Sequence, residues 1–236
     1  MSRNPTVRRG LAVLLLAAVV PLAACTSKAK ADEGPAPEAV VAAAKKTLDE
    51  TSGLYLRLTT DNLPDGIAGL TDADGIATHA PAFDGTISII FAGQSVDVPV
   101  VSVGGKVFAQ IPLTVGWSDV DPGDYGAPDP AALITPDRGF SSLLAATTGL
   151  TKGETVRGGA NNDEILTEYS GTVPGQVMHQ VIPSSSGANF SVTYSITDDD
   201  QLREATLTGV FYKDSPVMTY TVTLTDYGTT KNIAKP

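Results

Sequence analysis

The stretch Pro216-Val-Met-Thr-Tyr-Thr-Val-Thr-Leu-Thr-Asp226 alternates apolar side chains with threonines from Met218 to Thr225. Successive side chains of a β-strand point to opposite faces of a sheet, so this pattern predicts a strand with one apolar and one polar face. Valine, tyrosine and threonine are also residues that strands favour. Such a strand is typical of an antiparallel sheet that buries one face and leaves the other in water.

The same period of two recurs along most of the chain. Gly104-Gly105 predicts a tight hairpin turn, and Asp198-Asp199-Asp200 predicts another turn between strands. The length of 236 residues suits a single domain with a sizeable core. The other predicted strands cover residues 54–59, 87–91, 96–100, 106–111, 165–171, 190–197 and 201–212.

A few short segments depart from this alternation and predict helices. The clearest begins at Pro37 and places Val41, Ala44 and Leu48 on one helical face. A long sheet under short, alanine-rich helices either encloses an apolar void that admits hydrocarbon chains or holds an ordinary packed core. The pattern leaves both open. The predicted helices are residues 37–51, two short helices within 129–148 joined at Pro136, and residues 173–182.

The first 24 residues have the composition of a secretory signal. A basic start is followed by an apolar run over residues 11–22 and then by Leu22-Ala23-Ala24-Cys25. The run is about a dozen residues long, whereas a spanning helix needs about 20, so we expect no permanent span. The Leu-Ala-Ala-Cys sequence resembles the lipobox of bacterial lipoproteins, which implies cleavage before Cys25 and a diacylglyceryl group on its thiol. The alternative is an ordinary signal peptide whose cysteine is incidental.

Residues 25–37 are interpreted as the lipidated cysteine and a flexible tether, which reaches roughly 40 Å when extended. Cleavage would remove three arginines, so the formal net charge of −10 would become −13. This acidity argues against nucleic acid as a partner and against electrostatic docking to anionic lipid headgroups. We therefore expect the lipid on Cys25 to hold the protein on the outer face of the cell membrane, in the cell envelope.

No motif in the chain points to catalysis, a metal or a cofactor. A catalytic or metal site needs convergent side chains, and His79 and His179, the two histidines, lack such partners in the sequence. The acidic stretches Asp72–Gly75 and Asp121–Asp124 are incomplete as calcium loops and are interpreted as ordinary turns. We expect a protein that is not an enzyme and binds neither metal nor cofactor.

Several motifs, in a fairly specific order and spacing, resemble the actinobacterial LppX/LprG/LprA/LprF lipoproteins. The clearest lie between Trp117 and Leu144, and the similarity covers essentially all of residues 39–236. The motifs are Trp117-Ser118-Asp119, Tyr125, Asp129-Pro130-Ala131, Leu133, Pro136-Asp137, Gly139, Leu143-Leu144, the strand-turn-strand pattern of residues 85–110, Gln201-Leu202, and Thr225-Asp226-Tyr227-Gly228.

This resemblance implies an α+β domain over residues 38–236. Its expected architecture is a half-barrel: one strongly curved antiparallel sheet with short helices on the concave face around an apolar cavity. The implied function is to bind the acyl chains of a lipid or glycolipid and to carry it from the inner membrane toward the outer envelope. An inner-membrane lipid exporter is a possible partner in loading. The alternative function is that of a structural or assembly lipoprotein that acts through protein contacts.

The candidate cavity residues come from the apolar rows of the predicted strands and from the segment 129–148, which we expect to form a lid. Which row faces inward is not decided by the sequence, because a shift of register by one residue exchanges the two faces. The candidates are Leu56, Leu58, Ile87, Ile89, Phe91, Val98, Val100, Leu133, Leu143, Leu144, Val192, Tyr194, Phe211 and Leu224.

Overall fold

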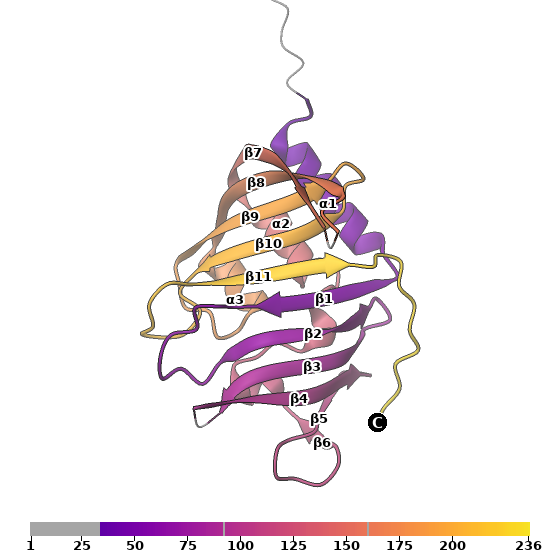
Figure 1. Cartoon of the computed structure of the whole chain (residues 1–236), viewed down its shortest axis with the longest axis vertical. Helices are drawn as coiled ribbons and strands as arrows, with labels where there is room; N and C mark the ends of the chain where they lie inside the picture. Colours follow the sequence, from indigo (N-terminus) through magenta and orange to yellow (C-terminus); the bar gives the residue numbers. More distant parts are fainter. Residues whose placement is uncertain (1–33, 92, 160) are drawn as a thin grey trace, which may run out of the picture. The chain divides into compact units, whose positions relative to one another are not determined.

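The computed structural model describes residues 34–91, 93–159 and 161–236. The predicted signal peptide, Cys25 and most of the predicted tether lie outside these described residues. Residues from Pro35 to Pro236 form one compact unit (Figure 1). The main hydrophobic cluster runs from Val41 to Leu224 and lies wholly within this unit, so the unit has its own core and can fold without the preceding segment.

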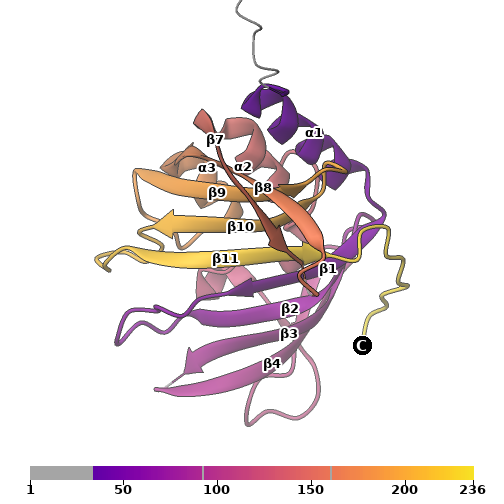
Figure 2. The ribbon, with the colours of Figure 1, turned by 45° about the horizontal axis from the view of Figure 1, so that its top comes forward.

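Within the described residues, eleven strands form one antiparallel sheet in the order β6-β5-β4-β3-β2-β1-β11-β10-β9-β8-β7. β1 and β11 are neighbours at its centre, and the sheet is open, with β6 and β7 at its edges (Figures 1 and 2). The strands are β1 (Gly53–Thr59), β2 (Leu70–Thr78), β3 (Ala82–Phe91), β4 (Gln94–Val103), β5 (Lys106–Ala109), β6 (Ser118–Val120), β7 (Thr148–Gly158), β8 (Glu164–Pro174), β9 (Asn189–Thr197), β10 (Leu202–Gly209) and β11 (Met218–Thr225).

The helices gather on the concave side of this curved sheet (Figures 1 and 2). α1 packs against α2, which contacts α3 and β8, and the turn η2 contacts β2, β3 and β4. None of the helices in the described part of the chain combines the length and apolarity needed to cross a bilayer. The helices are α1 (Pro37–Glu50), α2 (Phe140–Ala146) and α3 (Gly175–Val181), with the 3-10 turns η1 (Pro122–Tyr125) and η2 (Pro130–Ala132).

The register of the strands decides which side chains face the helices. Val222, Leu58, Ala73, Ile87 and Val98 lie directly opposite one another across five adjacent strands. Directly opposed residues share one face of a sheet. All five belong to the main hydrophobic cluster or pack against it, so this row lies on the concave face.

The predicted fold class is confirmed: an α+β protein with a curved antiparallel sheet and short helices. The helix predicted over residues 37–51 is α1, and the one predicted over residues 173–182 is α3. The prediction of two helices within residues 129–148 is right for α2, but the first of them is only the short turn η2.

The turn predicted at Asp72–Gly75 is wrong, because these residues lie in the middle of β2. Asp72 forms an ion pair with Arg57 at 2.7 Å, and the Tyr55 hydroxyl donates a hydrogen bond of 2.7 Å to Asp74. That hydrogen bond is the main cause that raises the pKa of Tyr55 to about 12. The acidic side chains therefore serve cross-strand pairing on the polar face rather than a turn.

β6 and β7 also lack a strand pattern in the sequence. β6 has only three residues, and β7 is an edge strand whose side chains are almost all exposed. An exposed edge strand carries no apolar row, since it buries neither face. Its sequence therefore resembles a polar loop.

Two glycines on the concave face allow β2 and β3 to approach closely. Gly75 lies directly opposite Gly85, and the ring of Phe83 lies over both. A Cβ atom on Gly75 would lie 2.6 Å from the Asp84 carbonyl oxygen, and one on Gly85 would collide with the Asp74 carbonyl oxygen. Any larger residue at this pair would push the two strands apart.

We predict that Gly85→Ala lowers the free energy of unfolding by about 1–3 kcal/mol, since the colliding atoms belong to the backbone. Gly153→Ala in β7 is the matched control, because the nearest atom to its Cβ would be the side-chain Cβ of Glu168 at 3.2 Å. Urea denaturation of both variants checks this. Equal effects would show that the close approach at Gly75 and Gly85 does not matter.

Candidate functional site

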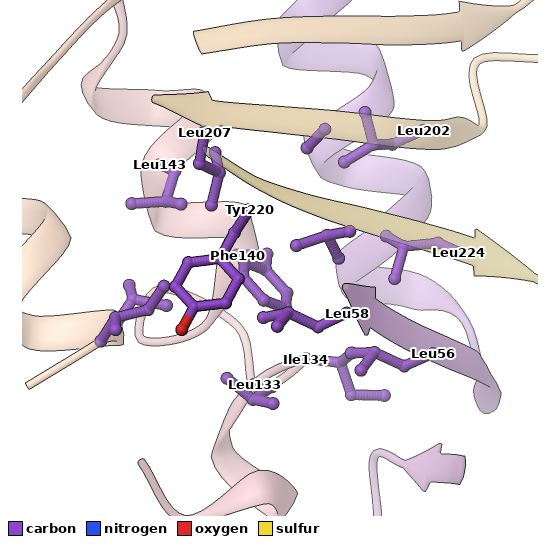
Figure 3. Close-up of a cluster of buried hydrophobic side chains, with 14 of the residues drawn as sticks. Leu56, Leu58, Leu133, Ile134, Phe140, Leu143, Leu202, Leu207, Tyr220 and Leu224 are labelled. Carbon is purple, nitrogen blue, oxygen red and sulfur yellow. The ribbon is translucent and has the colours of Figure 1, made fainter. Parts of the chain in front are cut away.

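The concave face carries one continuous apolar cluster that joins the sheet to the helices (Figure 3). Leu56, Leu58 and Leu224 point from the sheet toward Ile134 and Phe140 of the covering segment. All of these side chains are buried. The cluster is the largest apolar feature of the described residues, and it is therefore the candidate site.

The structure brings the predicted cavity residues together in this cluster. Ile87 and Ile89 are half-buried against it, and Phe91 ends β3 but its side chain lies outside the described part of the structure. The buried members among the predicted residues are Leu56, Leu58, Val98, Val100, Leu133, Leu143, Leu144, Val192, Tyr194, Phe211 and Leu224.

Sequence reasoning missed other members of the cluster. Ile134, Phe140, Leu202 and Leu207 take part in it, as does Tyr220 (Figure 3). Leu202 and Leu207 are an odd number of positions apart, so in a regular strand they would point to opposite faces. The register shift between Leu202 and Glu204 lets both face the core. The alternation of Tyr220 with threonines was the sequence signal that could have assigned Tyr220 to the apolar face of β11.

Aromatic rings fill one part of the interior. The ring of Phe211 lies between those of Phe190, at 4.9 Å between centroids, and Tyr220, at 4.8 Å. The Tyr220 hydroxyl donates to the Leu70 carbonyl oxygen at 2.9 Å and is hydrogen-bonded to the Tyr212 hydroxyl at 2.8 Å. Burial raises the pKa of Tyr220, so its hydroxyl stays neutral and bonded.

Residues 129–148, called the lid from here on, are fastened to the sheet at their beginning by two polar contacts. The buried hydroxyl of Ser102 donates a hydrogen bond of 2.6 Å to Asp129, whose carboxylate also accepts from the Ala131 amide at 2.9 Å. The Nε2 of His79 donates to the Ile134 carbonyl oxygen at 2.7 Å. These bonds tie the lid to the ends of β4 and β2.

The remainder of the lid has equally few polar attachments. The Thr147 hydroxyl is hydrogen-bonded to the Tyr194 hydroxyl at 2.8 Å, and Lys45 of α1 pairs with the exposed Asp137 at 2.9 Å. Burial raises the pKa of Tyr194, so its hydroxyl remains available for this bond. Between these polar contacts, the lid is held by apolar packing alone.

One end of the apolar face is only partly covered. We call this group the apolar rim; it consists of Leu70, Ile87, Ile89, Val96 and Ile111, all half-buried against the cluster. Ile89 lies directly opposite both Leu70 and Val96. The rim is where the interior comes nearest to solvent on β2, β3 and β4.

One hollow accompanies this face, and a second lies on the opposite face of the sheet beside the small cluster of Ala82, Val101 and Ile233. One, of about 290 Å³, lies between η1, the lid and α3, and it combines Leu133 and Val181 of the cluster with the polar Asp121, Arg138 and Gln180. The other, of about 370 Å³, lies beside the Gly104-Gly105 turn and the C-terminal residues. Neither of these two hollows lies between the sheet and α2, where side chains fill the space.

The described residues contain no group of three or more His, Cys, Asp or Glu side chains that could hold a metal ion. Both histidines are bonded to the backbone: His79 to Ile134, and His179, through Nδ1, to the Ser185 carbonyl oxygen at 3.0 Å. The chemistry that the site offers is therefore apolar contact.

An open half-barrel whose concave apolar face is covered by short helices is the fold of a known class of bacterial lipoproteins. The chain belongs to the LppX_LprAFG lipoprotein family, which matches residues 36–234. It is 29% identical over 240 residues to the lipoarabinomannan carrier protein LprG of Mycolicibacterium smegmatis, covering 97% of this chain and 95% of that one. LprG of Mycobacterium tuberculosis H37Rv is 28% identical over 203 residues, covering 84% and 83%.

Solved structures agree with the fold. LprF of Mycobacterium bovis matches with a TM-score of 0.70 at 16% identity, covering 86% of this chain and 98% of that one. LppX of Mycobacterium tuberculosis matches with a TM-score of 0.60 at 16% identity, covering 85% and 99%. The predicted family is confirmed.

We predict that Ser102→Ala lowers the free energy of unfolding by about 1–3 kcal/mol, because it removes a buried hydrogen bond to a carboxylate. The exposed Ser191 of β9, changed to Ala, is the control and should be nearly neutral. Hydrogen exchange should also rise at lid amides in Ser102→Ala. Unchanged exchange in the lid would show that the Ser102–Asp129 bond does not fasten it.

Proposed function

We propose that this protein is a non-catalytic lipid or glycolipid carrier of the cell envelope, and that acyl chains lie between the concave face and the lid. The observation that carries this proposal is the continuous apolar row across β11, β1, β2, β3 and β4 under a short, lightly fastened cover. The carrier names of the LprG relatives support it. Because the site is apolar, we infer that it recognises its cargo through contact with the acyl chains.

The free energies favour carriage over tight capture. Burial of each methylene away from water is worth about 0.8 kcal/mol, so a chain in water would be strongly disfavoured. A chain that leaves a bilayer was already in hydrocarbon, so transfer to an apolar site is nearly neutral. Loading and unloading can then both proceed, and the protein supplies a path of low free energy across water.

Chains can occupy this site only if the lid moves away from the sheet, because side chains fill the interface. The polar contacts that oppose this movement are Ser102 with Asp129, His79 with Ile134, Thr147 with Tyr194, and the ion pair of Lys45 with Asp137. A typical hydrogen bond contributes about 1 kcal/mol net, and an exposed ion pair less. Incoming chains replace the apolar contacts that the lid loses.

We place the protein on the outer face of the cell membrane, with lipid on Cys25 and a tether to residue 37. Transport from the inner membrane toward the outer envelope, with loading by an inner-membrane exporter, fits a tethered carrier of this kind. Two acyl chains hold a protein stably on a membrane, whereas one holds it marginally.

A structural or assembly lipoprotein is the second candidate function. One observation favours it: Leu56, Ile134 and Leu143 are almost fully buried and fill the space under the lid as in an ordinary core. In that case the protein would act through contacts with other proteins and would carry no lipid.

We predict that Val98→Trp empties the carrier without unfolding it. Val98 is buried but lies opposite the half-buried Ile87 of the apolar rim, so we expect the larger ring to extend toward the partly covered end. Stability should then change by less than about 1 kcal/mol while bound lipid is lost. Leu144→Trp, at a buried position of α2 within the lid, should instead lose about 1–3 kcal/mol, and the exposed Val217→Trp should behave like the parent.

Native mass spectrometry and thermal melting of residues 35–236, expressed in an actinobacterial host, measure both effects. A parent protein that carries no acylated lipid would overturn the carrier proposal in favour of the structural one. The same would follow if lipid loss tracked stability loss across Val98→Trp, Val100→Trp, Leu133→Trp and Leu144→Trp.

We further predict that Cys25→Ala abolishes stable membrane retention, because the lipid on Cys25 is the proposed anchor, but leaves the fold intact, because the main cluster begins at Val41. Fractionation after a salt wash, with melting as the control for folding, checks this. Quantitative recovery of Cys25→Ala in the membrane fraction would contradict the proposed anchor.

A further inference from the structure

The loop between β5 and β6, residues 110–117, presents large apolar side chains to solvent. Leu113 and Val115 are fully exposed, with relative accessibilities of 104% and 103%. The sequence contains no charged residue between Lys106 and Asp119, and these two form an ion pair with each other. Single exposed apolar residues are ordinary, but two fully exposed ones on an uncharged loop indicate an interaction surface.

The backbone of this loop holds Leu113 outward in an unfavourable conformation. The Thr114 amide donates to the Ile111 carbonyl oxygen at 3.1 Å, which closes a turn with Pro112 in its second position. Leu113, in the third position, has a φ of 68°, where glycine or asparagine is normally found. A strained residue of this kind persists where it serves a function.

Both ends of the loop are packed onto the domain. Ile111 belongs to the apolar rim and contacts the main cluster. Trp117 is half-buried against a separate small cluster that contains Val101 and Ile233. The loop is therefore held at both ends, and its tip projects beside the partly covered end of the apolar face.

We propose that residues 111–117 insert into the surface of a lipid bilayer. This proposal rests on the proposed carrier function in one respect: a carrier must meet a bilayer that delivers or receives its cargo. A protein partner of standard size would need about 800 Å² of surface on each side, which two projecting side chains do not offer. A bilayer does not require a large contact area, because a few apolar side chains can be buried in it. Tryptophan, as at Trp117, favours the boundary between hydrocarbon and water.

The position of the loop and the charge of the chain also bear on how the loop meets a bilayer. The loop projects at the end of the unit opposite to the beginning of α1 (Figure 1), so its contact with a bilayer does not depend on the anchor. The chain has a net charge of −10, and Asp121 and Asp124 follow β6 closely. Insertion is therefore driven by apolar burial, and neither anionic lipid nor low salt should strengthen it.

Trp117 is the only tryptophan of the chain and reports directly on this loop. The experiment uses residues 35–236 with phosphatidylcholine vesicles, with and without added phosphatidylglycerol, some of them carrying nitroxide-labelled acyl chains. We expect a blue shift of the tryptophan emission, quenching by the shallow nitroxide, and sedimentation with the vesicles. Added salt or phosphatidylglycerol should not increase binding.

Leu113→Ser combined with Val115→Ser should weaken vesicle binding by about a hundredfold or more, since each side chain contributes about tenfold or more on burial. Leu113→Gly should weaken vesicle binding in part. This variant should fold as stably as the parent, because glycine adopts this φ without strain. Val217→Ser, at an exposed apolar residue in the turn before β11, should bind like the parent.

Absence of quenching in the parent, equal binding by the double serine variant, or binding only to anionic vesicles at low salt would overturn the proposal. Lipid in the purified parent, measured by native mass spectrometry, separates this result from the proposed function. A parent that carries lipid but shows no quenching contradicts only the insertion of the loop. A parent that is quenched but carries no lipid supports insertion and contradicts carriage.

Discussion

The burial of only one face of the sheet is the constraint on which the rest of the structure depends. Each strand alternates its side chains between two faces, and the register joins residues of one face into rows such as Val222, Leu58, Ala73, Ile87 and Val98. A sheet this wide must cover that apolar face, and within the described residues short helices and turns are what covers it. The sheet curves around its cover (Figure 2), so a small cover suffices.

The same constraint joins stability to function. The residues that stabilise the fold, such as Leu56, Leu143 and Phe140, are also those that would contact acyl chains in the proposed carrier. A cover held by a few hydrogen bonds and by apolar packing can exchange those apolar contacts for lipid at little cost in free energy. The partly covered rim beside the β5–β6 loop gives the apolar interior a place to meet a bilayer.

Much of the fold could be predicted from the sequence where one face is buried. β11, β9 and α1 have clear periodicity because their apolar residues all face the core. β2 could not be predicted, since Asp72 and Asp74 occupy its polar face and Ala73 and Gly75 make its concave face small. β7 buries neither face and so carries no pattern at all.

Most residues predicted to line a cavity lie in one apolar cluster, because the apolar row of each strand could be recognised from its alternation. That they contact lipid stays a prediction. The inward face could not be predicted, because it depends on register, which is set by pairing between distant strands. The polar contacts of the lid, Ser102 with Asp129 and His79 with Ile134, join residues far apart in the sequence and carry no local signal.

The central claim is that acyl chains lie against the concave face, and paramagnetic NMR tests it most directly. Residues 35–236 with labelled methyl groups would be loaded with a phospholipid that carries a nitroxide within its acyl chain. The account predicts strong broadening of the methyl signals of Leu56, Ile87 and Val98 on the concave face, while those of Val101, in the separate small cluster with Ile233, stay sharp. Equal broadening at Val101, or none at Leu56 and Val98, would contradict it.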